Sequence, residues 1–239
     1  MQLTSDTFTS FSVTERLTQY QYLILPTRLE KGSSLAPLQN EIYNLFSMVH
    51  GPVTHDAISG DTFLRNEVCT GIFVNQKAVA CHQYCFFNLE TNAATASKYF
   101  QSISKISWDF FKDHNLTYVM SLEYLTVHPD FRKSKSGVSF AGVLGSLATM
   151  YMRERNADAG TAISRVDLKV DRTAAAIGFE TIESGLNCFG YDCCFQVCRT
   201  DRIKPNEDRG AGLLAEKLWQ SRRDYTNDDH GPDRIRLAA

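Results

Sequence analysis

A strand that ends at a proline and continues through a short basic loop into a long helix constrains this chain more than any other feature. Residues 125–137 read LTVHPDFRKSKSG and are followed by VSFAGVLGSLATMYMRERN. The first half is apolar up to Pro129, whereas the second half is rich in Lys and Ser and ends at Gly137. This order is typical of a loop that holds a phosphate-bearing ligand at the start of a helix.

The loop has the chemistry that such a ligand requires. A helix N-terminus carries unpaired N–H groups and a partial positive charge, and small residues allow a pyrophosphate to approach them closely. Arg and Lys side chains add positive charge, and Ser side chains add hydroxyl donors. The residues that we expect to bind the phosphates are Arg132, Lys133, Ser134, Lys135, Ser136, Gly137, Val138 and Ser139. The alternative is a polar loop that only caps a core helix.

Composition excludes several other classes. A net charge of −2 over 239 residues does not favour bulk binding to nucleic acid or to an anionic membrane. No apolar run reaches the roughly 18 residues of a membrane span, and the first residues do not resemble a secretory signal. We therefore expect a cytoplasmic protein. The His and Cys residues show no metal-ligand spacing, so no metal is expected.

The order of predicted elements indicates the fold class. We expect strands at 20–27, on both sides of a turn at 75–77, at 116–127, at 162–170 and within 180–198. Helices are expected from an N-cap at Ser34 to Gly51, over 95–113, up to Arg155, and as a short turn in 171–179, with a polar loop at 50–66. This predicts an α/β (α+β) fold with a central mixed, mostly antiparallel sheet flanked by helices. Residues 1–198 would form the domain, and 199–239 a charged tail with one short amphipathic helix.

The segment from Tyr118 to Phe179 resembles the core of the GNAT acyltransferase superfamily. In that family a long strand ending in V-x-P-x-x-R leads through a phosphate-binding loop into a helix, and LTVHPDFRKSKSG matches the Val, the Pro and the Arg. SRVDLKVDRTAAAIGF is similar to the next strand and to the Gly-Phe that closes the following helix. The resemblance implies an acyl-CoA or acyl-pantetheine donor whose arm inserts where the two strands separate.

LEYLTVHPDFR is also similar to the corresponding strand of N-acyl amino acid synthases and acyl-homoserine-lactone synthases. This resemblance implies a small-molecule amine acceptor, a donor that is acyl-CoA or acyl carrier protein, and a medium or long acyl chain. Thr126 stands where those relatives carry an Arg, which does not support lactone synthesis in particular. Aromatic residues that could line an acyl tunnel, or fill an ordinary core, are Phe73, Phe86, Phe87, Trp108 and Tyr124.

Glu123 is the candidate catalytic residue because it lies inside an otherwise apolar strand. A carboxylate buried there is costly unless it is paired, and partial desolvation raises its pKa towards that of a useful base. A structural ion pair or an exposed strand face would explain it equally well. Backbone N–H groups at Leu125, Thr126 and Val127 would bind the thioester carbonyl if the strand bulges there.

The general acid is not evident, since Ala174, Ala175 and Ala176 stand where many GNAT relatives place a Tyr. Three functions therefore remain open: an N-acyltransferase, a non-catalytic module that binds or senses acyl-CoA, and a structural or partner-binding protein without a cofactor. The sequence leaves the oligomeric state open.

Overall fold

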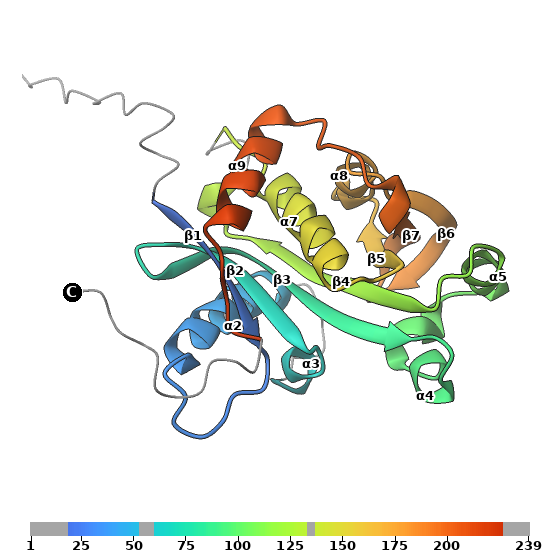
Figure 1. Ribbon diagram of the computed structural model, residues 1–239, viewed down its shortest axis with the longest axis horizontal. Coiled ribbons are helices and arrows are strands. Elements are labelled where there is room, and N and C mark those ends of the chain that lie inside the picture. Colours follow the sequence, from blue (N-terminus) through green and yellow to red (C-terminus); the bar gives the residue numbers. More distant parts are fainter. Residues whose placement is uncertain (1–18, 53–59, 133–136, 227–239) are drawn as a thin grey trace, which may run out of the picture.

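In the computed structural model, which describes residues 19–52, 60–132 and 137–226, the strands form one sheet of eight (Figure 1). Their order is β6-β7-β5-β4-β3-β2-β1-β8. Neighbouring strands are antiparallel except for the pairs β4/β5 and β1/β8, which are parallel. The strands are β1 (Tyr20–Pro26), β2 (Val68–Val74), β3 (Lys77–Asn88), β4 (Tyr118–Val127), β5 (Ala159–Arg165), β6 (Glu180–Cys188), β7 (Tyr191–Arg199) and β8 (Arg223–Asp224).

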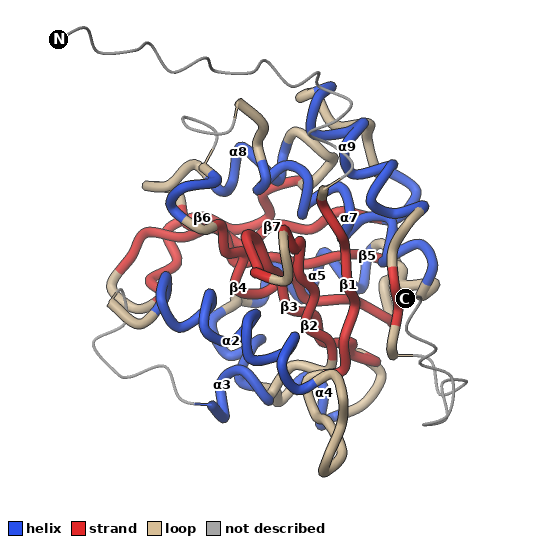
Figure 2. Tube along the Cα trace, turned by 90° about the vertical axis from the view of Figure 1, so that its left-hand side faces the viewer, coloured by secondary structure: helices blue, strands red, loops and turns tan. Residues whose placement is uncertain are grey.

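Helices cover both faces of this sheet, with α2 on one side and α7, α8 and α9 on the other (Figure 2). The α-helices are α2 (Ala36–His50), α3 (Gly60–Leu64), α4 (Asn92–Thr95), α5 (Lys105–Asp113), α7 (Phe140–Glu154), α8 (Val170–Ala175) and α9 (Arg209–Gln220). Short 3-10 helices are η1 (Lys98–Ser102), η2 (Pro129–Phe131) and η3 (Thr200–Arg202). The expected class, a mixed and mostly antiparallel sheet flanked by helices, is confirmed.

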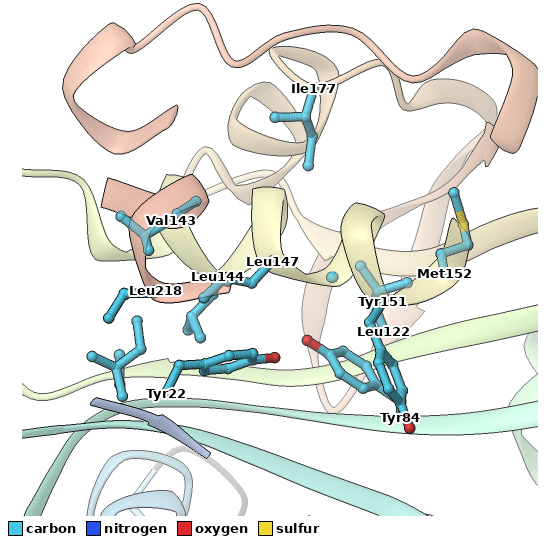
Figure 3. Packing of buried hydrophobic residues seen from close by; sticks show 14 of the residues in the cluster. Tyr22, Tyr84, Leu122, Val143, Leu144, Leu147, Tyr151, Met152, Ile177 and Leu218 are labelled. Atoms are coloured by element: carbon cyan, nitrogen blue, oxygen red, sulfur yellow. The ribbon is translucent and has the colours of Figure 1, made fainter. Parts of the chain in front are cut away.

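The largest apolar core lies between the sheet and α7 (Figure 3). Leu144, Leu147 and Tyr151 of α7 are fully buried against side chains of β1, β3 and β4. The amphipathic stretch expected in the C-terminal tail forms α9, which packs on α7 and adds Leu214 and Leu218 to the same core. After α9 the chain returns to the sheet, where β8 pairs with the edge strand β1.

Two smaller clusters lie on the opposite face. One joins α2 to β1–β3, and the other joins η1 and α5 to β4, β5 and β7. The aromatic residues considered for an acyl tunnel are divided among all three clusters, so they do not form one lining: Phe73 and Tyr124 with α2, Phe86 with α7, and Phe87 and Trp108 with α5. Of the two roles considered for these residues, a tunnel lining or an ordinary core, the clusters support the core.

Several predicted boundaries are also wrong, for local reasons. The helix expected over 95–113 is divided into α4, η1 and α5, because Ile103 is extended and the Ser104 side chain caps a new helix. Ile106, in the first turn of α5, is 63% exposed. The strand expected over 162–170 runs from Ala159 to Arg165, because the chain turns at 166–169, where the Lys169 N–H donates to the Val166 carbonyl and Lys169 has a left-handed backbone with φ 58°.

The remaining differences concern the segment between β1 and β2. Helix α2 begins after Leu35 and not after Ser34, and no side chain caps it. The polar loop expected over 50–66 contains the short helix α3. The turn between β2 and β3 agrees with the sequence, because Asn75 and Gln76 both have positive φ, as a two-residue hairpin turn of type I′ requires. Over the residues described, none of the helices has the length and apolar character to cross a bilayer.

The parting of β4 from β5 positions the candidate site. The two strands are paired in register from Val119↔Ala159 to Leu122↔Ala162, and the pairing then ends. Beyond this point β4 continues to Val127 on β3 alone, and β5 continues to Arg165 on β7 alone. Backbone groups of β4 beyond Leu122 are therefore not used in pairing with β5, which leaves them available to a ligand chain placed between the strands.

Candidate active site

A β-bulge occurs in β4 immediately after the last residue that pairs with β5. Gln83 of β3 is opposite Glu123, but Cys81 is opposite Thr126, so β4 contains one extra residue. Tyr124 has φ 55°, a left-handed conformation that is uncommon for a bulky residue. The bulge that the sequence analysis required for an oxyanion-binding amide is therefore present.

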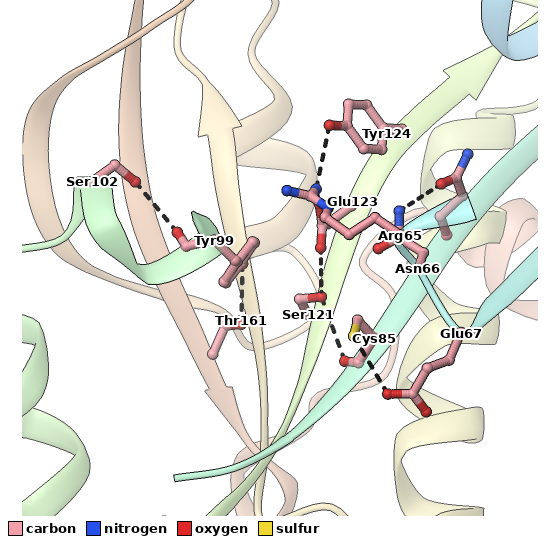
Figure 4. Close-up of polar contacts among 11 residues, drawn as sticks. Arg65, Asn66, Glu67, Cys85, Tyr99, Ser102, Ser121, Glu123, Tyr124 and Thr161 are labelled. Carbon is pink, nitrogen blue, oxygen red and sulfur yellow. Dashed lines mark hydrogen bonds and ion pairs between the residues drawn. The ribbon is translucent and has the colours of Figure 1, made fainter. Parts of the chain in front are cut away.

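Glu123 lies on the face of the sheet that carries α2, where it is 8% exposed. Figure 4 shows its side chain beside those of Arg65 and Ser121. Its carboxylate forms an ion pair with Arg65, which follows α3, and accepts a hydrogen bond from Ser121 Oγ at 2.9 Å. Burial raises the pKa of Glu123, while the Arg65 charge and the Ser121 hydrogen bond oppose that rise. The structural ion pair considered as an alternative thus exists, and it partly neutralises the carboxylate.

Arg65 is more accessible than its partner. Its side chain is 36% exposed, and Nη2 also donates to the Tyr124 hydroxyl at 3.4 Å. A guanidinium has five N–H donors, so it can bind an additional acceptor group while it contacts Glu123. The pair therefore presents one cation at the edge of the site and one carboxylate behind it.

Further buried polar side chains surround the Glu123 carboxylate. Gln83, its cross-strand partner, accepts a hydrogen bond from Asn66 Nδ2 at 2.6 Å. On the side of η1 and α5, the Tyr99 hydroxyl lies 3.1 Å from Thr161 Oγ1 (Figure 4). Burial raises the pKa of Tyr99, and the negative charge of Glu123 raises it further. The carboxylate thus lies between the α2 cluster and the η1/α5 cluster, in a region with polar side chains.

The three β4 residues after the bulge point in alternating directions. Leu125 and Val127 pack against the core under α7, whereas Thr126 is fully buried on the α2 side. There its hydroxyl lies 2.9 Å from His50 Nε2 at the end of α2. Burial lowers the pKa of His50 to about 4, so its ring is neutral at pH 7.

The expected phosphate loop is described only at its two ends. Arg132 follows η2, and Gly137 has φ 75°, with no atom of the described residues within 4 Å of an added Cβ. Ser139 caps α7 by accepting a hydrogen bond from the Gly142 N–H at 3.1 Å, and Val138 packs against the α7 core. Lys133, Ser134, Lys135 and Ser136 lie outside the described residues.

The structure therefore brings together Glu123 and the bulge, with the N-terminus of α7 at the far end of β4. Arg65 and Ser121 were missed by the sequence analysis. The signal for Ser121 was its spacing two residues before Glu123, which places both side chains on one strand face. Arg65 had a weaker signal, a lone cation before an apolar strand. Among the described residues, no group of three or more His, Cys, Asp or Glu could hold a metal ion.

The sequence matches no protein-family model and no curated protein. Solved structures share its architecture at low identity. FeeM, an N-acyl amino acid synthase from uncultured soil microbes, is 13% identical with a TM-score of 0.51; the match covers 83% of this chain and 98% of that chain. An agmatine N-acetyltransferase, also 13% identical, has a TM-score of 0.51 and matches over 74% of this chain and 99% of that chain.

BjaI, a CoA-dependent acyl-homoserine lactone synthase solved with SAM and isopentyl-CoA, is 7% identical with a TM-score of 0.54. The match covers 86% of this chain and 93% of that chain. These likenesses show that the chain has a GNAT-like fold, as the sequence resemblance implied. At such identities they show the fold alone.

Proposed function

We propose that the protein is an N-acyltransferase that moves an acyl group from an acyl-CoA or acyl-carrier-protein thioester to an amine acceptor. The observation that carries the proposal is the buried carboxylate of Glu123 at the point where β4 leaves β5, next to the Tyr124 bulge. A thioester arm between the two strands would bring its carbonyl carbon close to a proton acceptor and to an exposed edge of backbone amides.

In this reaction the acceptor nitrogen attacks the thioester carbonyl carbon. A C–N bond forms, the C–S bond breaks, and the proton of the attacking amine passes to Glu123 directly or through a water molecule. A partly desolvated carboxylate suits this role, because burial raises its pKa above the ordinary range. The thiolate leaves with the carrier, and we assign no group that protonates it, since α8 has Ala174 and Ala175 where relatives have a Tyr.

The negative charge that develops on the carbonyl oxygen needs a hydrogen-bond donor. The N–H of Leu125 is the best placed, because it follows the bulge and belongs to the part of β4 that is not paired with β5. We therefore propose Leu125, Thr126 and Val127 as the backbone segment that contacts the acyl-pantetheine.

Arg65 supports an acceptor that carries a carboxylate, such as an amino acid. It is a cation at the edge of the site, and its side chain is exposed enough to bind a second anion. A bidentate contact to that carboxylate would place the acceptor amine on the side of Glu123. FeeM, whose name describes an N-acyl amino acid synthase, has the same fold.

The loop before α7 is proposed to bind the pyrophosphate of the donor. We expect Gly137→Glu to weaken CoA binding at least tenfold in isothermal titration, because it places bulk and negative charge where the phosphates would lie. Gly185→Glu is a matched control, since Gly185 also has positive φ (76°) and open space around an added Cβ, but lies in β6. Equal CoA affinity in both variants would contradict the proposed phosphate site.

The acyl group is proposed to be of medium or long chain, because LEYLTVHPDFR resembles the corresponding strand of synthases that use such chains. Each methylene removed from water contributes about 0.8 kcal/mol, so a few buried carbons give a large preference. With decanoyl-CoA and acetyl-CoA in competition, we expect kcat/KM for decanoyl-CoA to be at least tenfold higher. A preference for acetyl-CoA would contradict the proposed chain length but not the proposed acyl transfer. CoA binding without any turnover would favour the acyl-CoA-sensing module instead.

A further inference from the structure

The bulge residue Tyr124 is held in an unfavourable conformation. A left-handed backbone is unfavourable for a residue with a Cβ, so the neighbours of Tyr124 must maintain it. The Tyr124 ring packs edge-on against Phe46 and His50, with centroid distances of 5.1 and 5.6 Å. The Arg65 contact described above holds its hydroxyl. These contacts fix the side chain, but the orientation of the peptide group that follows Tyr124 requires a further contact.

That contact comes from Thr126. Its Oγ1 donates a hydrogen bond to the Tyr124 carbonyl oxygen at 2.7 Å. The hydroxyl has a single proton, so at the 2.9 Å contact with His50 the Thr126 oxygen accepts and Nε2–H of His50 donates. The neutral state of His50, in which burial lowers the pKa to about 4, is compatible with this assignment. His50, Thr126 and the Tyr124 carbonyl therefore form one directed chain of hydrogen bonds.

The direction of this carbonyl also determines the direction of an N–H group. The carbonyl of Tyr124 and the N–H of Leu125 belong to the same planar trans peptide, in which they point in opposite directions. Because Thr126 and His50 hold the carbonyl on the α2 side of the sheet, the Leu125 N–H must point away from α2. This is the amide proposed above to bind the developing oxyanion.

We propose that His50 and Thr126 are positioning residues that fix the Tyr124–Leu125 peptide and so aim the Leu125 N–H at the thioester carbonyl. The inference rests on the proposed acyl transfer. In this proposal neither the Thr126 hydroxyl nor the His50 ring binds substrate or transfers its proton, because both are engaged in the hydrogen-bond chain. Their contribution is to keep one hydrogen-bond donor in place before the substrate arrives.

Thr126→Val tests the proposal because valine keeps the shape of threonine and removes the hydroxyl. We expect kcat to fall about tenfold, with the KM values of acyl-CoA and of the amine acceptor changed by less than about twofold. The orientation of the Leu125 N–H affects the transition state most, because the negative charge on the carbonyl oxygen develops there. Thr126→Ser retains the hydroxyl and should keep kcat within about twofold of wild type. His50→Phe, which retains the packing of the ring against Tyr124, should lower kcat in the same direction.

Thr70→Val is the matched control. Thr70 is also fully buried in the sheet, but its hydroxyl donates to the His82 carbonyl at 3.1 Å on the edge of β3 that pairs with β2, and not on the edge that pairs with the bulged strand β4. It should reduce thermal stability as Thr126→Val does, but leave kcat unchanged. The positioning role is refuted if Thr126→Val has the same kcat as Thr70→Val. It is also refuted if Thr126→Ser lowers kcat as much as Thr126→Val does.

Crystal structures of wild type and Thr126→Val separate this inference from the proposed function. We expect the Tyr124 carbonyl in the variant to turn away from residue 126, with φ of Tyr124 leaving the value of 55°. An unchanged Tyr124–Leu125 peptide refutes the inference, whatever the activity. If wild type transfers no acyl group to any amine, the proposed function fails, and the crystal structures alone decide whether the pair holds the peptide.

Discussion

Glu123→Gln is expected to lower kcat about 10²-fold while the protein remains folded. The amide has nearly the shape of the carboxylate and can still accept the hydrogen bond from Ser121, but it cannot accept the proton of the attacking amine. The loss should appear in kcat more than in KM, because proton transfer occurs on the way to the transition state. Initial rates with saturating acyl-CoA and acceptor measure the effect.

The pH profile provides a second readout for the same variant. Burial raises the pKa of Glu123, so the wild-type rate should fall on the acidic side at a pH above the ordinary carboxyl value of 4.5. This acidic limb should be absent in Glu123→Gln. Glu41→Gln is the control, because it removes a carboxylate that is ion-paired with Lys77 at the turn between β2 and β3 and not with Arg65. It should keep both the wild-type rate and the acidic limb of the pH profile. If Glu123→Gln has wild-type turnover, the carboxylate has only a structural role.

Arg65→Met is expected to affect both the base and the acceptor. The Arg65 charge lowers the pKa of Glu123, so its removal raises that pKa further. The acidic limb should therefore move to higher pH, and the rate lost at pH 7 should be partly regained as the pH increases. The KM for an amino-acid acceptor should also rise about tenfold, because a charge-assisted hydrogen bond to its carboxylate is lost.

Two comparisons isolate these effects. An amine acceptor without a carboxylate should show the shift of the limb but little change in KM. Arg28→Met removes a nearby exposed arginine that bonds the Leu64 carbonyl and not Glu123, and it should leave the pH profile and KM unchanged. An acidic limb that stays at its wild-type position in Arg65→Met would show that the ion pair does not control the base.

Local patterns in the sequence predicted the framework of this site. The apolar run of β4, the proline after it and the basic loop before α7 each have a local signature, and the structure has β4 and α7 in that order. The break between η1 and α5 was missed because the apolar spacing continues across Ser104, whose side chain begins a new helix. The sequence signal of such a cap is limited to one or two residues, whereas the apolar spacing of a helix extends over many, so the spacing hides the cap.

The partners of Glu123 and Thr126 could not be predicted in the same way. Arg65 lies 58 residues from Glu123, and His50 lies 76 residues from Thr126, so both contacts depend on how α2 and α3 pack on the sheet. The bulge was expected only as a condition for catalysis, since its left-handed residue is a Tyr and no Gly marks the position. Tertiary packing determines these features.

The most direct test of the account is to measure amide formation by mass spectrometry. Purified protein would be incubated with acyl-CoA of several chain lengths and with amino acids or amines lacking a carboxylate. We predict an N-acyl amino acid product that forms with wild type and Glu41→Gln, and at about 10²-fold lower rate with Glu123→Gln. Release of CoA with only the free fatty acid, or an N-acyl product formed equally by Glu123→Gln, would contradict the assignment of Glu123 as the base of an N-acyltransferase.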